Sequence, residues 1–227
     1  MSTRTIYIMR HGRTVWNEEG RLQGHKDSPL LPESIDLVHA MAEFFRDKEI
    51  GKIYSSPLRR CSATADIVSD VLGLPFARDA RLMECAHGLC DGMLLSDTRA
   101  SCPDYYAQWE KDRWNTAWPG GESYRDVFLR AQSFAADLNR LPGGGDVQAE
   151  IPDHERRDCE GENSRAASRT GTGHRPEGCL VIAHAQVNMC LVGALLSLTA
   201  AEILDLRQKN GTIYIASENL LRKVEFA

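Results

Sequence analysis

The sequence predicts a single α/β domain in which a mainly parallel central sheet is covered by helices on both faces. Short apolar runs with the composition of strands alternate with longer amphipathic patterns along the 227 residues. Such alternation is typical of a parallel sheet covered by helices. A chain of this length can also bury one sizeable hydrophobic core. We therefore expect one domain that spans residues 1–227.

Five segments have the composition of strands, being short, apolar and rich in β-branched or aromatic residues. The third is an uninterrupted apolar run, CLVIA, which is typical of a strand buried on both faces. The last two are separated by only two residues and predict a terminal hairpin or meander. The five expected strands are residues 5–9, 52–55, 179–183, 211–217 and 220–226.

Four segments carry apolar residues at helical spacing and are expected to form the covering helices. Ser56 is the expected N-cap of the second. The fourth is expected to continue through residues 200–206. A further helical excursion at residues 103–118 is a candidate cap over a binding site. The four expected helices are residues 32–48, 58–72, 122–141 and 187–196.

Residues 143–177 do not have the composition of a packed domain. They include three successive glycines, five arginines and eight acidic residues, and Val147 and Ile151 are their only aliphatic residues larger than alanine. Burial of so little apolar surface does not offset the entropy lost on ordering. We expect a disordered insertion on the face opposite the carboxyl ends of the strands. A tolerated loop and a regulatory or partner-binding segment are both open interpretations.

The overall charge argues against several classes of partner. The chain has 27 basic and 32 acidic residues, a net charge of −5, and no dense basic run. Nucleic acid and membrane surfaces are therefore not expected as partners. No signal peptide and no apolar stretch of about 20 residues is present. Seven cysteines without a Cys-x-x-Cys pair indicate reduced thiols, and hence a cytoplasmic protein. The sequence leaves the oligomeric state open.

Four fragments at expected strand ends or helix starts carry the residue types that bind and transfer a phosphate. They are residues 9–12, 55–60, 82–88 and 182–185. The carboxyl ends of parallel strands meet at one edge of a sheet, where ligands bind. Arginines beside a helix N-terminus favour a bound dianion. Each fragment alone also has a plain structural explanation, such as a surface histidine or a solvated arginine pair, and Arg59 is expected to be solvated.

The fragments and their order resemble the histidine phosphatase superfamily, the phosphoglycerate-mutase-like proteins, and within it the small phosphatase branch. Arg10-His11-Gly12 followed by Thr14, Trp16 and Asn17 is similar to the family's opening motif. The resemblance runs in order from about residue 5 to residue 188 and is interrupted only by the insertion. Its further segments are residues 21–24, 27–30, 55–65, 82–92 and 119–123, and His184.

This resemblance implies a phosphatase that acts on a small phosphorylated metabolite without a metal or another cofactor. It implies that His11 is the nucleophile and becomes a phosphohistidine. Arg10, Arg60 and His184 would hold the transferring group, and Glu84 would be the proton donor. The chemistry agrees, because fixed cations around three equatorial oxygens stabilise phosphoryl transfer. His11 must then attack through an unprotonated nitrogen, and we expect a backbone acceptor to fix the proton on the other.

Five further residues are candidates for substrate binding. Asn17, Gln23 and Gly24 are expected to donate hydrogen bonds to the phosphate, and Arg21 and His87 to line the mouth of the site. For each of the loop residues, a polar loop held by internal hydrogen bonds is an equal alternative.

Three departures from the family pattern bear on the activity. Arg13 stands where the family usually has an acid or an amide. Ala185-Gln186 replaces a glycine pair, which predicts a stiffer turn with less room near the phosphate. Residues 85–87 differ from the segment with which the mutase branch re-binds its substrate. A phosphatase is therefore favoured over a mutase, by analogy with the family.

Other classes of protein fit the sequence less well. A zinc hydrolase would use the same histidines and Glu84, but no His-Glu-x-x-His pairing exists and two arginines would repel a metal. A P-loop enzyme lacks its glycine-rich signature. A non-catalytic phosphate-binding relative remains an alternative, although such a protein has no use for the protonatable Glu84 beside His11.

Overall fold

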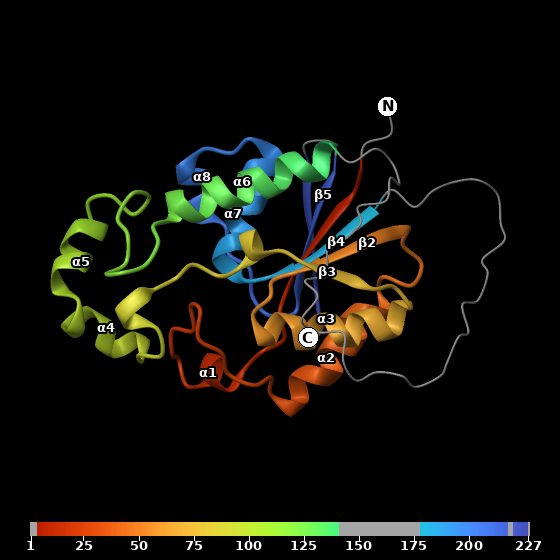
Figure 1. Ribbon diagram of the computed structural model, residues 1–227, viewed down its shortest axis with the longest axis horizontal. Helices are drawn as coiled ribbons and strands as arrows, with labels where there is room; N and C mark the ends of the chain where they lie inside the picture. Colours follow the sequence, from red (N-terminus) through yellow and green to blue (C-terminus); the bar gives the residue numbers. More distant parts are fainter. Residues whose placement is uncertain (1–3, 141–177, 218–219, 227) are drawn as a thin grey trace, which may run out of the picture.

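The computed structural model describes residues 4–140, 178–217 and 220–226. Within them, six strands form one sheet in the order β3-β2-β4-β1-β5-β6 (Figure 1). Strands β1 to β4 are mutually parallel, and β5 and β6 add an antiparallel edge. The prediction of a mainly parallel sheet is confirmed. The strands are β1 (Ile6–Arg10), β2 (Ile50–Ser55), β3 (Phe76–Arg78), β4 (Gly178–Ala183), β5 (Thr212–Ser217) and β6 (Leu220–Glu225).

Helices cover both faces of this sheet, as the alternating pattern predicts. Helices α2 and α3 lie on one face, and α6, α7 and α8 lie on the other (Figure 1). The α-helices are α1 (Val15–Glu18), α2 (Pro32–Glu43), α3 (Arg59–Leu72), α4 (Leu95–Ser101), α5 (Pro103–Trp109), α6 (Tyr124–Arg140), α7 (Ala185–Leu196) and α8 (Ala200–Asp205). Two short 3-10 helices lie at Ala80–Leu82 and Gly88–Cys90.

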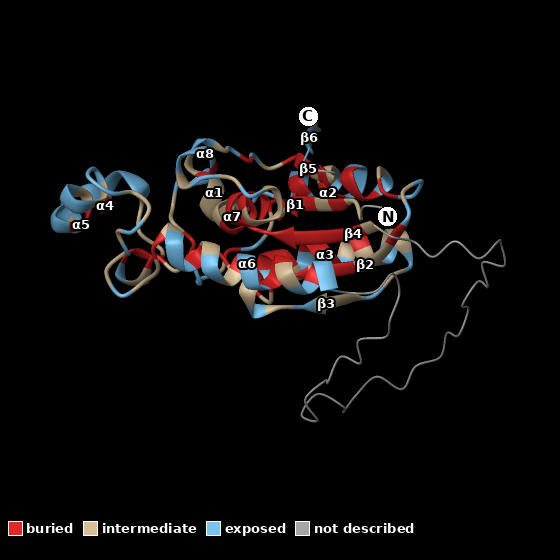
Figure 2. Cartoon of the chain, turned by 90° about the horizontal axis from the view of Figure 1, so that it is seen from above, coloured by how far each residue is buried: buried red, intermediate tan, exposed pale blue. Residues whose placement is uncertain are grey.

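Strand β4 is buried on both faces, which explains its uninterrupted apolar sequence. Leu180 and Ile182 pack into the core beneath α2 and α3, whereas Val181 and Ala183 pack into the core beneath α6 and α7. Side chains alternate between the two faces along a strand, so a strand between two helical layers needs apolar residues at every position. The burial colours of Figure 2 show this strand inside the molecule.

Several helix boundaries differ from the predicted ones. Helix α2 ends at Glu43, and the chain continues to Lys48 in tighter turns. Helices α7 and α8 do not form one helix, because Ser197 adopts a left-handed conformation with φ 55° and ends α7. Thr199 then begins α8 with a reciprocal capping box to Glu202. Such a Thr-x-x-Glu spacing is a helix start that the periodic pattern alone overlooks.

Two features of the chain were not predicted from the periodicity. Strand β3 has only three residues at the sheet edge, too few for a pattern to be recognised. The expected excursion at residues 103–118 is helical only over α5, and α4 precedes it. Helices α4 and α5 stand out at one end of the molecule and are mostly exposed (Figures 1 and 2).

The expected insertion at residues 143–177 lies outside the described residues. Gly178, which follows it, opens β4 and therefore lies at the opposite end of that strand from His184. Among the described helices, none is long and apolar enough to cross a membrane.

We expect Phe134→Ala to lower the free energy of unfolding by about 3–5 kcal/mol. Phe134 is 1% exposed and packs between α6 and the sheet, where its ring meets Tyr54 edge-on. Truncation therefore removes buried apolar surface and leaves a cavity. Leu129→Ala on the same helix is the matched control, because Leu129 is 51% exposed and its loss should change stability by less than about 0.5 kcal/mol. Urea denaturation that finds equal effects of the two variants would contradict the assigned packing.

Candidate functional site

The strand register brings two of the predicted histidines together. Arg10, the last residue of β1, lies opposite Ala183, the last residue of β4. His11 and His184 therefore follow adjacent parallel strands at the same level, and the His11 N–H donates to the Ala183 carbonyl (3.0 Å). The two imidazole rings meet edge to face, with centroids 5.1 Å apart. This edge of the sheet is where open α/β folds bind ligands.

The His11 ring is buried and has a defined tautomer. Its Nδ1 lies 2.7 Å from the Gly12 carbonyl oxygen. A carbonyl only accepts hydrogen bonds, so Nδ1 carries the proton and Nε2 keeps its lone pair. The backbone acceptor expected for His11 is therefore present. Burial, followed by the positive charges of Arg60 and Arg10, holds the pKa of His11 well below 6.5, so the ring is neutral near neutral pH.

Gly12 is required for this arrangement because helix α2 packs directly against it. A Cβ at this position would lie 2.7 Å from the Ser34 hydroxyl oxygen and 3.0 Å from a methyl of Val38. The Gly12 N–H also donates to Thr64 Oγ1 (3.0 Å) on α3. Two helices therefore fix the backbone whose carbonyl orients His11.

Arg60 lies at the start of α3 and is 2% exposed. Its Nη1 donates to the Lys26 carbonyl (2.7 Å) and to Asp27 Oδ1 (2.8 Å), and its Nη2 donates to the Gly24 carbonyl (2.8 Å). Its Nε donates to Nδ1 of His184 (3.2 Å). One Nη2 hydrogen has no bond to the described part of the chain. Arg60 is thus rigidly held and retains one donor for a ligand.

His184 is fully buried, and both of its ring nitrogens have protein partners. Because Arg60 only donates, Nδ1 of His184 is the acceptor and Nε2 carries the proton. This Nε2 lies 2.9 Å from Ser56 Oγ and 3.3 Å from Cys61 Sγ. Burial and the charge of Arg60 hold the pKa of His184 well below 6.5.

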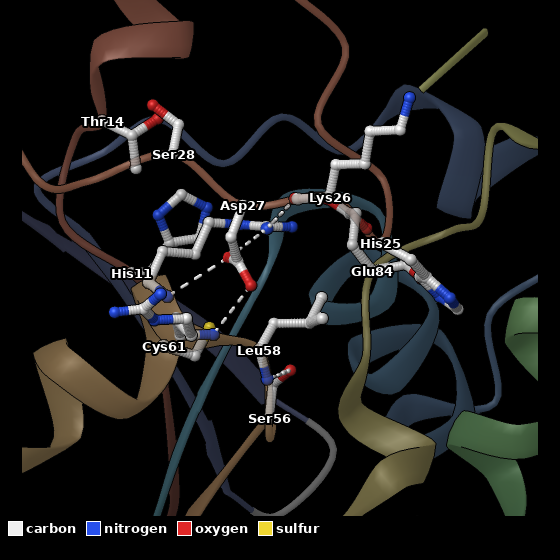
Figure 3. A network of polar contacts seen from close by, with 12 residues as sticks. His11, Thr14, His25, Lys26, Asp27, Ser28, Ser56, Leu58, Cys61 and Glu84 are labelled. Atoms are coloured by element: carbon white, nitrogen blue, oxygen red, sulfur yellow. Dashed lines mark hydrogen bonds and ion pairs between the residues drawn. The ribbon is translucent and has the colours of Figure 1, made fainter. Parts of the chain in front are cut away.

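Ser56 is not the N-cap of α3 that the sequence predicted. The N-cap is Leu58, which has no capping side chain of its own. Asp27 from a distant loop replaces it, since its carboxylate accepts from the backbone N–H groups of Arg59 (3.0 Å) and Arg60 (3.3 Å). The same carboxylate pairs with the Arg60 guanidinium at 2.8 Å. In the view of Figure 3, Asp27 is drawn between His11 and Lys26.

Arg10 joins the cluster from the end of β1. Its Nη1 donates to the Gln208 carbonyl (3.0 Å), and its buried Nε has no bond within the described residues. Burial lowers the pKa of Arg10, and the negative charge of Glu84 partly offsets this effect. Arg10 therefore has unused donors near both His11 and Glu84.

Residues near the C-terminal end of the chain support this corner of the site. The Gln208 amide nitrogen donates to the carbonyls of Ile8 (3.0 Å) and Thr212 (3.1 Å), and Asn188 donates to the Gln208 side-chain oxygen (2.8 Å). Asn210 donates to the His11 carbonyl (2.8 Å). The backbone of residues 8–11 is thus fixed by side chains almost 200 positions away.

Glu84 lies over the first turn of α7, directly after His184. Its Oε1 accepts from the Cys85 N–H (3.0 Å) and the Val187 N–H (3.4 Å), and its Oε2 accepts from the Gln186 N–H (3.4 Å). Such backbone donors stabilise a carboxylate at a helix N-terminus. The structure therefore gathers His11, His184, Arg10, Arg60 and Glu84 into one cluster. Their chemical roles stay predictions.

Two of the predicted binding residues are engaged in hydrogen bonds with other parts of the protein. Asn17 Oδ1 accepts from the Thr14 N–H (3.1 Å) and hydroxyl (3.1 Å), which closes the capping box of α1. Asn17 therefore makes the internal loop hydrogen bonds that the alternative interpretation expects. Arg21 donates to Glu19 and, across to another loop, to the Gly92 carbonyl (3.0 Å).

The other three predicted binding residues lie at a buried junction, which is the contact of residues 23–25 with residues 87–91. Gly24 has φ +50°, and a Cβ there would lie 1.8 Å from Oδ1 of Asp91. That carboxylate also accepts from the N–H groups of His25 and His87 (both 3.1 Å). His87 is 4% exposed, and its ring packs edge-on to Trp118. Gln23 is buried beside Gly24. Contact between these residues and a substrate stays a prediction.

A hollow of about 620 Å³ lies between this junction and helix α4. Basic and acidic groups share its lining, which includes Arg21 and Lys26 as well as Asp91 and Asp97. Lys26 Nζ donates to the Asp91 carbonyl (2.7 Å). The lining residues are Trp16, Arg21, Lys26, Leu89, Asp91, Gly92, Met93, Leu94, Asp97 and Ser101.

Residues 6–149 match the family model described as the histidine phosphatase superfamily, branch 1. The chain belongs to this superfamily. The resemblance carried by its motifs is therefore confirmed.

Curated relatives of this chain include both phosphatases and probable mutases. It is 27% identical over 135 residues to phosphoserine phosphatase 1 of Hydrogenobacter thermophilus, a match that covers 60% of this chain and 64% of that protein. It is 34% identical over 143 residues to the probable phosphoglycerate mutase GpmB of Yersinia pestis, covering 61% of this chain and 65% of that protein. These matches span less than two thirds of either relative.

Solved structures share the whole fold. The native mycobacterial glucosyl-3-phosphoglycerate phosphatase is 26% identical, with a TM-score of 0.73, and the comparison covers 94% of this chain and 89% of that one. The putative α-ribazole-5'-P phosphatase of Escherichia coli has a TM-score of 0.74 at 18% identity, over 98% and 95% of the two chains. At 18% identity, the similarity to the Escherichia coli protein shows only that the two chains share a fold.

The departures from the family pattern take defined positions in the structure. Arg13 is exposed and lies 3.8 Å from Glu18, so it does not face the cluster in the present arrangement. Gln186 contributes its backbone N–H to Glu84, and its side-chain amide lies 3.3 Å from the Tyr124 hydroxyl. Within the described residues, no group of three or more His, Cys, Asp or Glu side chains is placed to hold a metal ion.

The buried histidines predict a loss of stability in mild acid. Because the folded pKa values of His11 and His184 lie well below 6.5, the unfolded chain binds more protons at these positions once the pH falls below about 6.5. The contribution of these two histidines to the free energy of unfolding is therefore complete above that pH, and it is lost as the pH falls toward the folded pKa values. Each histidine contributes up to about 1.4 kcal/mol per pH unit.

Urea denaturation between about pH 5 and pH 7 tests this expectation, since most carboxylates titrate below that window. His11→Asn should reduce the slope of the free energy of unfolding against pH, by an amount that corresponds to at most one bound proton. His39→Asn is the control, because His39 is exposed on α2. Identical slopes for all three proteins would show that the cluster histidines are not held neutral.

Proposed function

We propose that this histidine phosphatase hydrolyses a small phosphomonoester through a phosphohistidine formed on His11. The observation that supports this proposal is the state of the His11 ring. Its Nδ1 proton is bonded to the Gly12 carbonyl, so Nε2 presents a lone pair beside two guanidinium groups. A neutral imidazole in such a setting is a competent nucleophile toward a phosphate dianion.

In the first step, His11 Nε2 attacks phosphorus and the bond to the ester oxygen breaks. The leaving oxygen takes a proton from Glu84, which acts as the general acid. The products of this step are the free alcohol and the phosphohistidine. Arg10 supplies an unpaired Nε–H to the transferring group, and Arg60 supplies its remaining Nη2–H. Fixed cations of this kind stabilise the charge on the equatorial oxygens.

In the second step, the Glu84 carboxylate removes a proton from water, and the resulting hydroxide attacks the phosphohistidine. The N–P bond breaks, inorganic phosphate leaves, and the lone pair returns to His11. Hydrogen bonds from the first turn of α7 hold the Glu84 carboxylate in place during this step. His184 donates to the phosphoryl group by exchanging its Nε2–H bond to the Ser56 hydroxyl.

For the substrate, we propose a phosphate ester that also carries a carboxylate. The names of three relatives support this class, because phosphoserine, phosphoglycerate and glucosyl-3-phosphoglycerate are all phosphorylated acids. Arg21 and Lys26 line the hollow beside the cluster and would meet a second anion there. Comparison of kcat/KM for phosphoserine with that for phosphoethanolamine, which lacks the carboxylate, tests the proposal. Equal values would exclude a carboxylate requirement.

A mutase is the second candidate, because the identity to the probable phosphoglycerate mutase reaches 34%. Both activities begin with the same phosphohistidine and differ in the acceptor, which is water in one case and a second hydroxyl of the substrate in the other. Incubation with 3-phosphoglycerate distinguishes them. Release of inorganic phosphate supports the phosphatase, whereas formation of 2-phosphoglycerate without phosphate release supports the mutase.

We expect His11→Ala to abolish turnover while the protein stays folded, because the nucleophile is lost. The assay follows hydrolysis of p-nitrophenyl phosphate in excess chelator, and alkaline quenching of the wild type should trap a phosphoenzyme that is stable in alkali and lost on acid treatment. His39→Ala, an exposed substitution on α2, should keep wild-type activity. Turnover by His11→Ala, or a wild type without any phosphoenzyme, would contradict the proposed nucleophile. Loss of wild-type activity in chelator would exclude a metal-independent reaction.

Glu84→Gln should slow esters of poor leaving groups by about 10²–10⁴-fold. Activated aryl esters should be slowed far less in the first step, because their leaving oxygen needs no proton. Burst-phase kinetics with p-nitrophenyl phosphate isolate that step, while alkyl phosphates report on the need for the acid. If phosphoenzyme formation from both kinds of ester is slowed equally, Glu84 is not the proton donor.

A further inference from the structure

Two cysteines outside the catalytic cluster lie in direct contact. The sulfur atoms of Cys90 and Cys102 are 2.8 Å apart, and both residues are free thiols. This separation is inside the van der Waals contact of two sulfur atoms. Only a small approach separates the pair from a covalent bond.

The pair joins two different parts of the fold. Cys90 ends the 3-10 helix Gly88–Cys90, in the loop that carries Glu84. Cys102 lies at the junction where α4 ends and α5 begins. A bond between them would therefore attach the exposed α4–α5 excursion to the loop that supplies the proposed proton donor.

The two thiols differ in their access to solvent. Cys90 is fully buried, whereas Cys102 is partly exposed. Burial and the neighbouring Cys102 raise the pKa of Cys90 to about 12, so Cys90 stays protonated near neutral pH. Since the thiolate is the reactive form and needs access to its target, Cys102 is the thiol that meets a soluble oxidant first.

The other described cysteines have no comparable partner. Each of them is buried, and no second sulfur lies within hydrogen-bonding reach of any of them in the described residues. Burial raises the pKa of each of these thiols, which makes them unreactive. They are Cys61, Cys85, Cys179 and Cys190.

We propose that Cys90 and Cys102 form a reversible disulfide with small-molecule disulfides such as oxidised glutathione as the oxidant. The Cys102 thiolate attacks one sulfur of glutathione disulfide, forms a mixed disulfide and releases one glutathione. The Cys90 thiol, which is in contact with Sγ of Cys102, attacks this sulfur and passes its proton to the departing glutathione thiolate, so that the second glutathione is released. Two protein thiols are oxidised, one glutathione disulfide is reduced, and each released thiolate takes up one proton.

The cross-link would fix two walls of the hollow beside the cluster. Leu89 and Met93 flank Cys90 on one wall, and Asp97 and Ser101 precede Cys102 on the other. Oxidation would therefore restrict motion of α4 and α5 relative to the loop and stabilise this end of the molecule. This inference does not depend on the proposed phosphatase activity.

Peptide mapping of the full chain tests the bond directly. The protein is treated with oxidised glutathione, blocked with an alkylating reagent and digested with trypsin without reduction. Cleavage after Arg81, Arg99 and Lys111 should leave residues 82–99 joined to residues 100–111, with a mass two hydrogens below the sum of the two peptides. Dithiothreitol should separate them.

Four variants assign the bond to this pair. Cys85→Ser should keep the cross-link, which excludes the other cysteine of the first peptide, and Cys159→Ser should keep it as well. Cys102→Ser should abolish it. Cys90→Ser should instead accumulate one glutathione on Cys102, because the second thiol is missing.

Stability provides an independent readout. Oxidation should raise the thermal unfolding midpoint of the wild type by about 5 °C and slow tryptic cleavage after Arg99 in α4, with neither effect in Cys102→Ser. The proposal is overturned if wild-type Cys102 retains glutathione without the internal bond, if Cys102 pairs with another cysteine, or if glutathione leaves both thiols unmodified. Equal midpoints of the oxidised and reduced wild type would overturn the stabilising role.

Discussion

The site depends above all on one buried cation. Arg60 is a guanidinium enclosed in the protein, and such a charge is costly to bury unless an opposite charge and hydrogen-bond acceptors surround it. Asp27 supplies the opposite charge, two loop carbonyls each accept one of its hydrogens, and His184 accepts from its Nε. The Arg60 side chain thereby fixes the position of the loop that contains Asp27, the start of α3, and the tautomer of His184, which follows β4. These elements cannot shift independently, so the proposed phosphate site is formed without a ligand.

A second contact links the loop that carries Glu84, the proposed proton donor, to the residues around Arg60. Asp91 fills the space beside Gly24 and accepts from two backbone N–H groups, one on each loop. The Gly24 carbonyl in turn accepts from Arg60. The proposed general acid and the anion-binding group therefore belong to one connected framework. Preorganisation of this kind places charge where it develops in the reaction without a later cost of rearrangement.

Much of this architecture could be predicted from the sequence, because its signals are local. The apolar run of β4 and the helical stripes identify the layers, and His11 and His184 follow strands whose parallel register brings them together. The partners of these residues could not be predicted in the same way. Asp27 caps a helix 32 positions away, and Ser56 bonds His184 instead of capping α3. Their roles arise from tertiary contacts between segments with no shared periodicity. The edge strand β3 could not be predicted either, because its three residues are too few to show a periodic pattern.

The support of residues 8–11 by Gln208 and Asn210 has a consequence for how the protein folds. These two side chains lie between α8 and β5, so the backbone around His11 is held by a segment about 200 positions further along the chain. Contacts between such distant segments form slowly, because a long loop must close before they are made. The backbone around His11 therefore becomes fixed only when β5 has paired with β1.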